Sequence, residues 1–192
     1  MLTELKRGVI FTVTMIAVVI AYHLLIWGVG RVAFAGQAEG SLIRRADGTV
    51  VGSHLIAQKF ARPEYFQPRP SAVDYNAAST GGSNYGPSNP DHLKAVHDRM
   101  DGIEAQEHVT ANHIPSEMVT TSGGGLDPDV PPAAALIQAP RVAEARGVPL
   151  DRVRALITQY TTPPAWGFLG RARVNVLDLN LALDTTLGVV KH

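Results

Sequence analysis

The sequence predicts an α+β fold: one N-terminal transmembrane helix followed by a single loop-rich soluble α+β domain. Three observations lead to this prediction. A 23-residue stretch near the N-terminus contains no residue of fixed charge. Short β-favouring runs and helical patterns both follow it, and 18 glycines and 13 prolines interrupt them. A chain of 192 residues has room for one such domain beyond an anchor.

The apolar stretch, residues 8–30, is long enough to cross a membrane. At about 1.5 Å per residue it reaches roughly 34 Å, against a hydrocarbon core of about 30 Å. Lys6 and Arg7 precede it and Arg31 follows it, while Trp27 lies towards its second end, where aromatic rings favour the interface. This pattern predicts a membrane span that contacts the lipid bilayer.

A cleaved export signal is the alternative, because Ala33-Phe34-Ala35 before Gly36 has the small-x-small form of a cleavage site. The apolar region of a signal peptide is usually about 7–15 residues long, so the longer stretch favours an uncleaved anchor. His23 is the only titratable group inside the span. It lies near the interfacial end, faces a partner helix, or has a function of its own.

The immediate flanks, with two basic residues before the span and one after it, favour a cytoplasmic N-terminus. Counting as far as Arg44 and Arg45 reverses that tally. We expect residues 1–7 in the cytoplasm, residues 8–30 in the membrane and residues 31–192 as an extracytoplasmic domain.

The soluble part begins with two β-favouring runs, residues 41–45 and 49–51. Asp47-Gly48 between them is a hairpin signal. Residues 55–60 favour a further short strand. Residues 61–90 mix five prolines and several glycines with aromatic side chains, which predicts a long ordered loop instead of a disordered linker.

Helices dominate the remainder. Asn89 as N-cap before Pro90 starts the first, and a second is predicted over residues 133–146 with Gly147 ending it. A third carries its inner face at Leu150, Val153, Leu156, Ile157 and Tyr160. Residues 174–187 fit a strand or a helix, and Asn175 as a possible N-cap favours the helix.

Composition excludes several kinds of chemistry. The 17 basic and 17 acidic residues give no strong field for nucleic acid, which is not predicted as a partner. Without cysteine there is no thiol catalysis and no Cys-ligated metal. The histidine pairs are spaced by five residues, unlike ligands that share a helix face, so no metal is predicted.

No recognised catalytic motif occurs, and no catalytic residue is predicted. A membrane-anchored hydrolase using Ser83 or Ser122 is the weakest alternative. Two glycine-rich loops are candidates for a nucleotide-binding module, because free backbone amides before a helix can hold phosphate. Their ordinary interpretation is as turns that need positive φ. The candidate residues are Gly81, Gly82, Ser83, Asn84, Ser122, Gly123, Gly124 and Gly125.

Segments along nearly the whole chain together resemble the C subunit of the bacterial Kdp potassium-transporting P-type ATPase. They include Gly40-Ser41-Leu42-Ile43, Pro63-Glu64-Tyr65-Phe66, Gly81-Gly82-Ser83-Asn84, Gly125-Leu126-Asp127, Gln138, Arg141-Val142-Ala143, Ala145-Arg146, and Leu179-Asn180-Leu181-Ala182-Leu183-Asp184.

The resemblance implies a non-catalytic accessory subunit of an ATP-driven, high-affinity potassium import complex in the bacterial inner membrane. Its implied partners are a channel-like potassium subunit, a P-type ATP-hydrolysing subunit and a small single-helix subunit. The implied role is to stabilise assembly, and to act as a catalytic chaperone that raises the pump subunit's affinity for ATP. ATP is therefore the implied cofactor, although an outward-facing domain would place both glycine loops away from cytoplasmic ATP.

The implied assembly role makes the loop of residues 65–85 a candidate docking surface for the channel-like subunit. Aromatic and arginine side chains are frequent anchors of protein interfaces. The candidate interface residues are Tyr65, Phe66, Arg69, Tyr75 and Tyr85.

Overall fold

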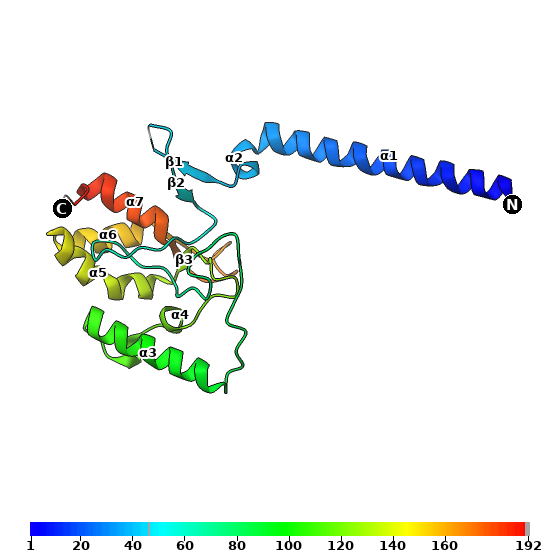
Figure 1. Ribbon diagram of the computed structural model, residues 1–192. Helices are drawn as coiled ribbons and strands as arrows, with labels where there is room; N and C mark the ends of the chain where they lie inside the picture. Colours follow the sequence, from blue (N-terminus) through cyan, green and yellow to red (C-terminus); the bar gives the residue numbers. More distant parts are fainter. Residues whose placement is uncertain (46, 191–192) are drawn as a thin grey trace. The chain divides into compact units, whose positions relative to one another are not determined.

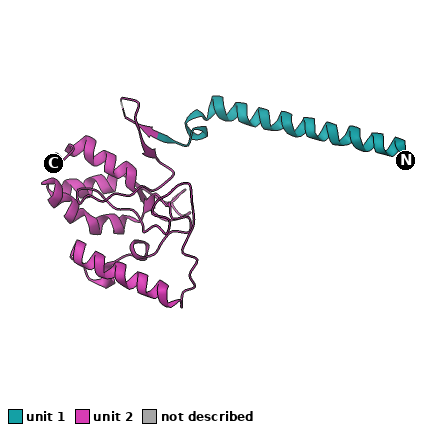
Figure 2. Cartoon of the chain, in the orientation of Figure 1, with its two compact units in different colours: residues 1–42 teal, residues 43–192 magenta. Residues whose placement is uncertain are grey.

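The computed structural model describes residues 1–45 and 47–190 of the chain, whose elements are labelled in Figure 1. The chain forms two compact units, residues 1–42 and residues 43–192 (Figure 2). The first unit contains the predicted membrane span, and the second contains almost all of the remaining secondary structure.

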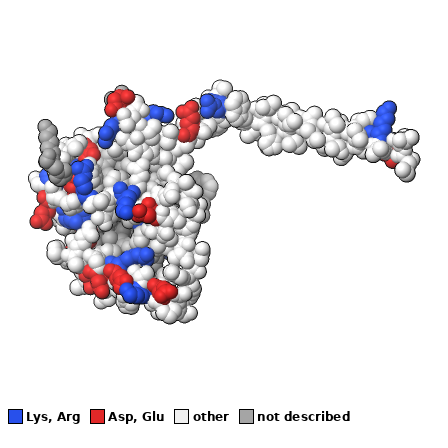
Figure 3. All heavy atoms as spheres, in the orientation of Figure 1, with Lys and Arg blue, Asp and Glu red and all other residues white. Residues whose placement is uncertain are grey.

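The first unit is a long helix, α1 (Leu2–Ala33), followed by the single turn α2 (Ala35–Ala38). None of the residues of α1 is buried, and Figure 3 shows its surface uncharged between the groups near its two ends. Within the described chain, α1 is the one helix long and apolar enough to cross a membrane.

Polar side chains within α1 are satisfied by the helix itself. The hydroxyls of Thr12 and Thr14 donate to the carbonyls of Gly8 and Ile10, at 2.9 and 2.8 Å. The Nδ1 of His23 lies 2.7 Å from the Val19 carbonyl oxygen. Hydrocarbon supplies no hydrogen-bond partners, so such internal pairing suits a helix that lies in lipid.

A two-stranded sheet of β1 (Leu42–Arg44) and β2 (Val50–Ser53) begins at the last residue of the first unit, and it confirms the predicted hairpin. In the turn, the Thr49 amide donates to Oδ1 of Asp47 at 2.9 Å, and Gly48 has a φ of +84°. The further strand expected over residues 55–60 is wrong. Those residues form a turn and irregular backbone, because their backbone amides pair with Ser53 and Leu126 instead of with a strand.

Residues 61–89 contain no helix or strand, as predicted, and lead to α3 (Pro90–Glu107). The side chain of Asn89 accepts hydrogen bonds from the amides of Asp91 and His92, which confirms it as the N-cap. The short 3-10 helix η1 (Ala111–His113) and the single turn α4 (Ser116–Val119) follow.

A three-stranded antiparallel sheet is built from very short strands. They are β3 (Asp129–Val130), β4 (Thr161–Thr162) and β5 (Arg173–Asn175), in the order β3-β5-β4. Val174, at the centre of β5, lies opposite Val130 on one side and Thr161 on the other.

Three helices pack beside this sheet: α5 (Pro132–Arg146), α6 (Leu150–Gln159) and α7 (Val176–Leu187). Helix α6 contacts both α5 and α7, and the three lie together in Figure 1. Gly147, with a φ of +63°, ends α5, and the Asn175 side chain caps α7, so both predictions are confirmed. Residues 176–187 are thus helical, as favoured, with β5 directly before them.

The hydrophobic core joins these helices to the sheet and to one residue of the long loop. Its members are Phe66, Val130, Ala134, Ala135, Ala139, Val142, Ala143, Val153, Leu156, Ile157, Val174, Val176, Leu179 and Leu183. Tyr160, expected on the inner face of α6, is instead exposed, because α6 ends at Gln159 and the chain turns into β4.

Candidate functional site

Two of the predicted interface residues lie inside the domain. Phe66 is fully buried and Tyr65 is 9% exposed, and Phe66 packs in the core with residues of α5 and α7. The structure places both side chains in the core instead of on the surface. They hold the long loop against the helices, and Phe66 has no surface left for another subunit.

The backbone around Phe66 is bound by two side-chain amides. Asn180 of α7 accepts from the Phe66 amide at 2.8 Å and donates to the Phe66 carbonyl at 2.9 Å. Gln138 of α5 does the same for Gln67, at 2.7 and 3.1 Å. Each amide therefore replaces the strand partner that this irregular, buried segment lacks.

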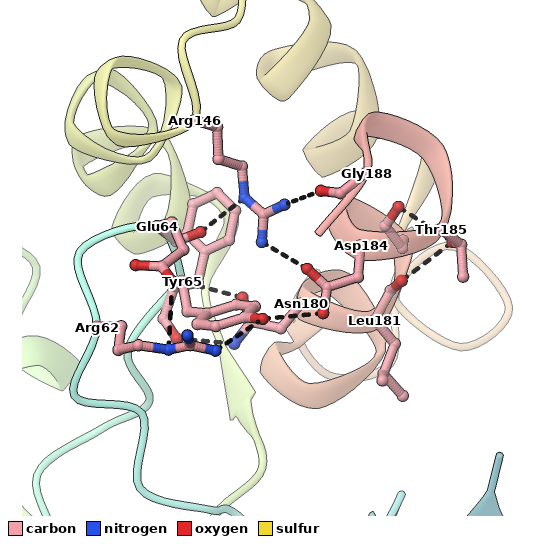
Figure 4. Close-up of polar contacts among 11 residues, drawn as sticks. Arg62, Glu64, Tyr65, Arg146, Asn180, Leu181, Asp184, Thr185 and Gly188 are labelled. Carbon is pink, nitrogen blue, oxygen red and sulfur yellow. Dashed lines mark hydrogen bonds and ion pairs between the residues drawn. The ribbon is translucent and has the colours of Figure 1, made fainter. Parts of the chain in front are cut away.

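A second set of contacts surrounds Arg146, whose side chain is 1% exposed (Figure 4). Its guanidinium donates to Asp184 at 2.8 Å, to the Glu64 carbonyl at 2.8 Å and to the Gly188 carbonyl at 3.0 Å. The Tyr65 hydroxyl donates to the other Asp184 oxygen at 2.9 Å, and the guanidinium lies 5.0 Å from the centre of the Tyr65 ring. Burial is the main cause that raises the pKa of Tyr65, and its hydrogen bond to Asp184 adds to it.

Arg141 connects the same segment to α3. It donates to Glu107 at 2.8 Å and to the carbonyls of Pro63 and Tyr65 at 2.6 and 3.1 Å. Burial raises the pKa of the Glu107 carboxyl, and the nearby Arg141 charge opposes that effect. The loop residues 62–67 are thus fixed by side chains of α5 and α7, and Arg141 also joins α5 to Glu107 of α3.

The two glycine-rich loops lie against each other. The Gly81 amide donates to the Gly124 carbonyl at 3.1 Å, and a Cβ on Gly82 would lie 2.9 Å from the Gly123 oxygen. At Gly125, φ is +69° and a Cβ would lie 2.7 Å from a methyl group of Val73. These glycines therefore permit a close approach of two backbones and a left-handed turn.

The second glycine loop does not adjoin a helix N-terminus, contrary to expectation. Strand β3 lies between Gly125 and the start of α5 at Pro132. Ser122 is buried, with its Oγ accepting from the Asp127 amide at 3.4 Å, whereas Ser83 and Asn84 are exposed. Across the residues described, neither Ser83 nor Ser122 forms a hydrogen bond with a histidine, so the geometry offers no activating base for a hydrolase.

Arg69 joins the long loop to Asp127, which follows the second glycine loop, and Tyr75 supports Arg69 from within the long loop. Arg69 pairs with Asp127 at 3.0 Å, and the Tyr75 hydroxyl donates to the Arg69 carbonyl at 2.8 Å. Burial is the main cause of a raised pKa at Tyr75. Tyr85 differs from both, because it is 48% exposed and free to meet a partner.

A cavity of about 350 Å³ lies beside Arg69, between the long loop, α3 and α4. Arg69 and Arg99 line it together with Glu107 and Glu117, and none of the eight candidate nucleotide-binding residues does. Arg69 Nε and Glu107 Oε2 lack a hydrogen-bond partner within the described part of the chain. The cavity is large enough for ordered water, at about 30 Å³ a molecule, that would satisfy these two atoms.

Sequence reasoning overlooked an exposed apolar turn at residues 165–169, where Trp166, Phe168 and Leu169 face the solvent. The sequence of this turn has the same pattern as the long loop, with aromatic residues between prolines and glycines. As for metals, no group of three or more potential ligands occurs within residues 1–45 and 47–190.

Comparison with known protein families gives a match over most of the chain. A family model described as KdpC, the c chain of the K⁺-transporting ATPase, matches residues 5–185. That range includes all but the first three residues of α1, both glycine loops and all of the side chains that hold residues 62–67.

Three relatives are each named potassium-transporting ATPase KdpC subunit. That of Polaromonas naphthalenivorans is 50% identical over 179 residues, covering 92% of this chain and 91% of the relative. That of Caulobacter vibrioides strain NA1000 is 53% identical over 167 residues, covering 86% and 84%. That of Shewanella putrefaciens is 47% identical over 173 residues, covering 90% and 85%. The chain therefore belongs to the KdpC family of K⁺-transporting ATPase subunits.

Proposed function

We propose that this non-catalytic subunit stabilises the assembly of a potassium-importing ATPase, by packing α1 among the partners' membrane helices and docking its domain on the channel-like subunit. The observation that carries the proposal is the surface of α1. None of its residues is buried, and those between its charged ends are almost entirely apolar. Lipid or other membrane helices must cover such a surface.

The proposed topology has residues 1–7 in the cytoplasm, residues 8–30 in the membrane and residues 31–192 outside. Lys6 and Arg7 against Arg31 support it, whereas a tally that includes Arg44 and Arg45 favours the reverse. A reporter enzyme that is active only outside the cytoplasm, fused after His192, tests the orientation. Activity supports the proposal. Activity of a reporter that works only in the cytoplasm contradicts it.

The loop of residues 65–85 keeps its proposed docking role. Some of its predicted interface residues fix the loop in place, and one is exposed for contact with a partner. Tyr65, Phe66, Arg69 and Tyr75 fix the loop to the domain through the contacts described above. Tyr85 is the exposed member that can contact the channel-like subunit.

Co-purification of the full chain with the other subunits tests this role. Tyr85→Ala should lower the yield of the complex, and Tyr160→Ala, which removes a tyrosine exposed to a similar degree, should not. Equal yields from the two variants would remove Tyr85 from the interface.

The proposed effect on the pump subunit's ATP affinity passes through contacts between subunits. One observation and the proposed topology argue against direct contact of the glycine loops with ATP. Gly81 already donates its amide to Gly124. The proposed topology would place both loops outside the cytoplasm. Equilibrium dialysis of the full chain in detergent with labelled ATP at millimolar concentration is the test. Saturable binding that Gly125→Ala abolishes would favour the nucleotide-binding module instead.

A further inference from the structure

The hairpin between β4 and β5 carries an unusual concentration of exposed apolar side chains at its tip. Trp166 is 83% exposed, Phe168 is 79% and Leu169 is 55%. An aromatic side chain offers on the order of 150–250 Å² for burial, so the tip rivals the largest apolar patches of soluble proteins, about 300–600 Å². No charged residue occurs from Thr161 to Gly170.

The tip is held in one conformation by its own backbone. Ala165 and Leu169 exchange two hydrogen bonds of 2.9 Å, and the Gly167 amide donates to the Pro164 carbonyl at 3.0 Å. Trp166 and Gly167 have φ values of +52° and +82°. A non-glycine residue rarely adopts a positive φ, and such strain is typical of binding sites. The two aromatic rings are thus presented on a closed turn.

The base of the hairpin is tied to the domain by ion pairs. Arg171 pairs with Glu117 of α4 at 3.3 Å, and Arg173 pairs with Asp129 of β3 at 3.1 Å. The two basic residues that follow the tip are exposed to solvent, but each is matched by a carboxylate. The base of the hairpin therefore presents no excess positive charge to lipid phosphates, whereas peripheral membrane-binding segments combine apolar side chains with an excess of lysine or arginine.

We infer that residues 165–169 form a preorganised knob that inserts into an apolar cleft on another subunit of the ATPase complex. This inference rests on the proposed assembly function and names its docking element. Trp166 and Phe168 fill the cleft, and a carbonyl or carboxylate at its mouth accepts the N–H of the Trp166 indole, whose ring is exposed. A rigid knob fits a shaped protein surface better than a fluid bilayer.

Mutation within the intact complex provides the first test. Trp166→Ala/Phe168→Ala should lower the yield of co-purified complex at least ten-fold, as expected for two central aromatic anchors. Leu55→Ala, at another exposed apolar residue, is the control and should keep the wild-type yield. A wild-type yield from the double variant would overturn the inference. Failure of the unmodified chain to co-purify would instead contradict the proposed function itself.

A photo-cross-linking phenylalanine at position 166 covers the case in which the double variant fails to fold, because it keeps an aromatic side chain. Illumination of the purified complex should give an adduct with another protein subunit. Adducts only with lipid would show that the tip rests on the bilayer, and the absence of any adduct would show that it remains in water. Either result overturns the inference.

Discussion

Replacing Asn180 by leucine removes the two hydrogen bonds from its side chain to the Phe66 backbone, with little change in side-chain volume. The Phe66 amide and carbonyl, both buried, lose hydrogen bonds of 2.8 and 2.9 Å. An unsatisfied buried group costs about 1–3 kcal/mol, and the added apolar side chain offsets part of the total. The expected loss in the free energy of unfolding is about 2–4 kcal/mol.

Thermal unfolding of the full chain in detergent, followed by near-ultraviolet circular dichroism, measures this loss. For a domain of this size, 1 kcal/mol corresponds to roughly 2–4 °C, so the melting temperature should fall by roughly 4–16 °C. Hydrogen exchange should also accelerate at the amides of Phe66 and Gln67 in particular. The control, Gln159→Leu, changes an exposed amide side chain on α6 and should stay within about 0.5 kcal/mol. If the two variants melted at the same temperature, the hydrogen bonds of Asn180 to Phe66 would contribute nothing to stability.

Three further predictions concern other contacts. Gly125→Ala should destabilise the domain by about 2 kcal/mol or more, because the residue has a positive φ and an added Cβ would be crowded. Gly124→Ala is the control, since its added Cβ would meet nothing within 4 Å. It should be nearly neutral in the same melting experiment. Burial raises the folded-state pKa of Glu107, so the folded state holds the carboxyl proton more tightly than the unfolded state does. The free energy of unfolding should therefore fall as pH rises from the ordinary pKa of about 4.5 through the raised value. Glu107→Gln should flatten that part of the pH–stability curve, and an unchanged curve would contradict the assignment. Arg146→Met leaves Asp184 without its cation and should lower the free energy of unfolding, measured by chemical denaturation, by about 3–5 kcal/mol. Arg146→Lys should restore only part of that free energy, because one ammonium group cannot reach all three acceptors.

Local signals in the sequence predicted the ends of elements well. Asn89 and Asn175 cap helices, and Gly147 ends one, because each acts on backbone groups within a few residues of itself. The apolar stretch was equally clear, since the span needs only length and hydropathy. The expected strand over residues 55–60 failed because a strand needs a partner, and Ala57 finds its acceptor at Leu126 instead.

The arrangement of the candidate site could not be predicted in the same way. Asn180 and Gln138 contact residues 114 and 71 positions away, and no periodicity in the sequence marks such pairs. In the sequence, the exposed and the buried aromatic residues both have prolines and glycines near them, so this pattern does not predict which of them are buried. Only the packing distinguishes Phe66 in the core from Trp166 on the surface. The segments that resemble the Kdp C subunit include Asn180 and Gln138, but the resemblance does not show what these two side chains bind.

The proposed function requires α1 to remain in the membrane as part of the mature protein. The intact mass of the chain, measured on cells fractionated into membrane and soluble material, tests this directly. We predict a chain that retains residues 8–30, found in the membrane fraction together with the other subunits of the ATPase. A chain that begins at Gly36 and appears in the soluble fraction would contradict the proposed function.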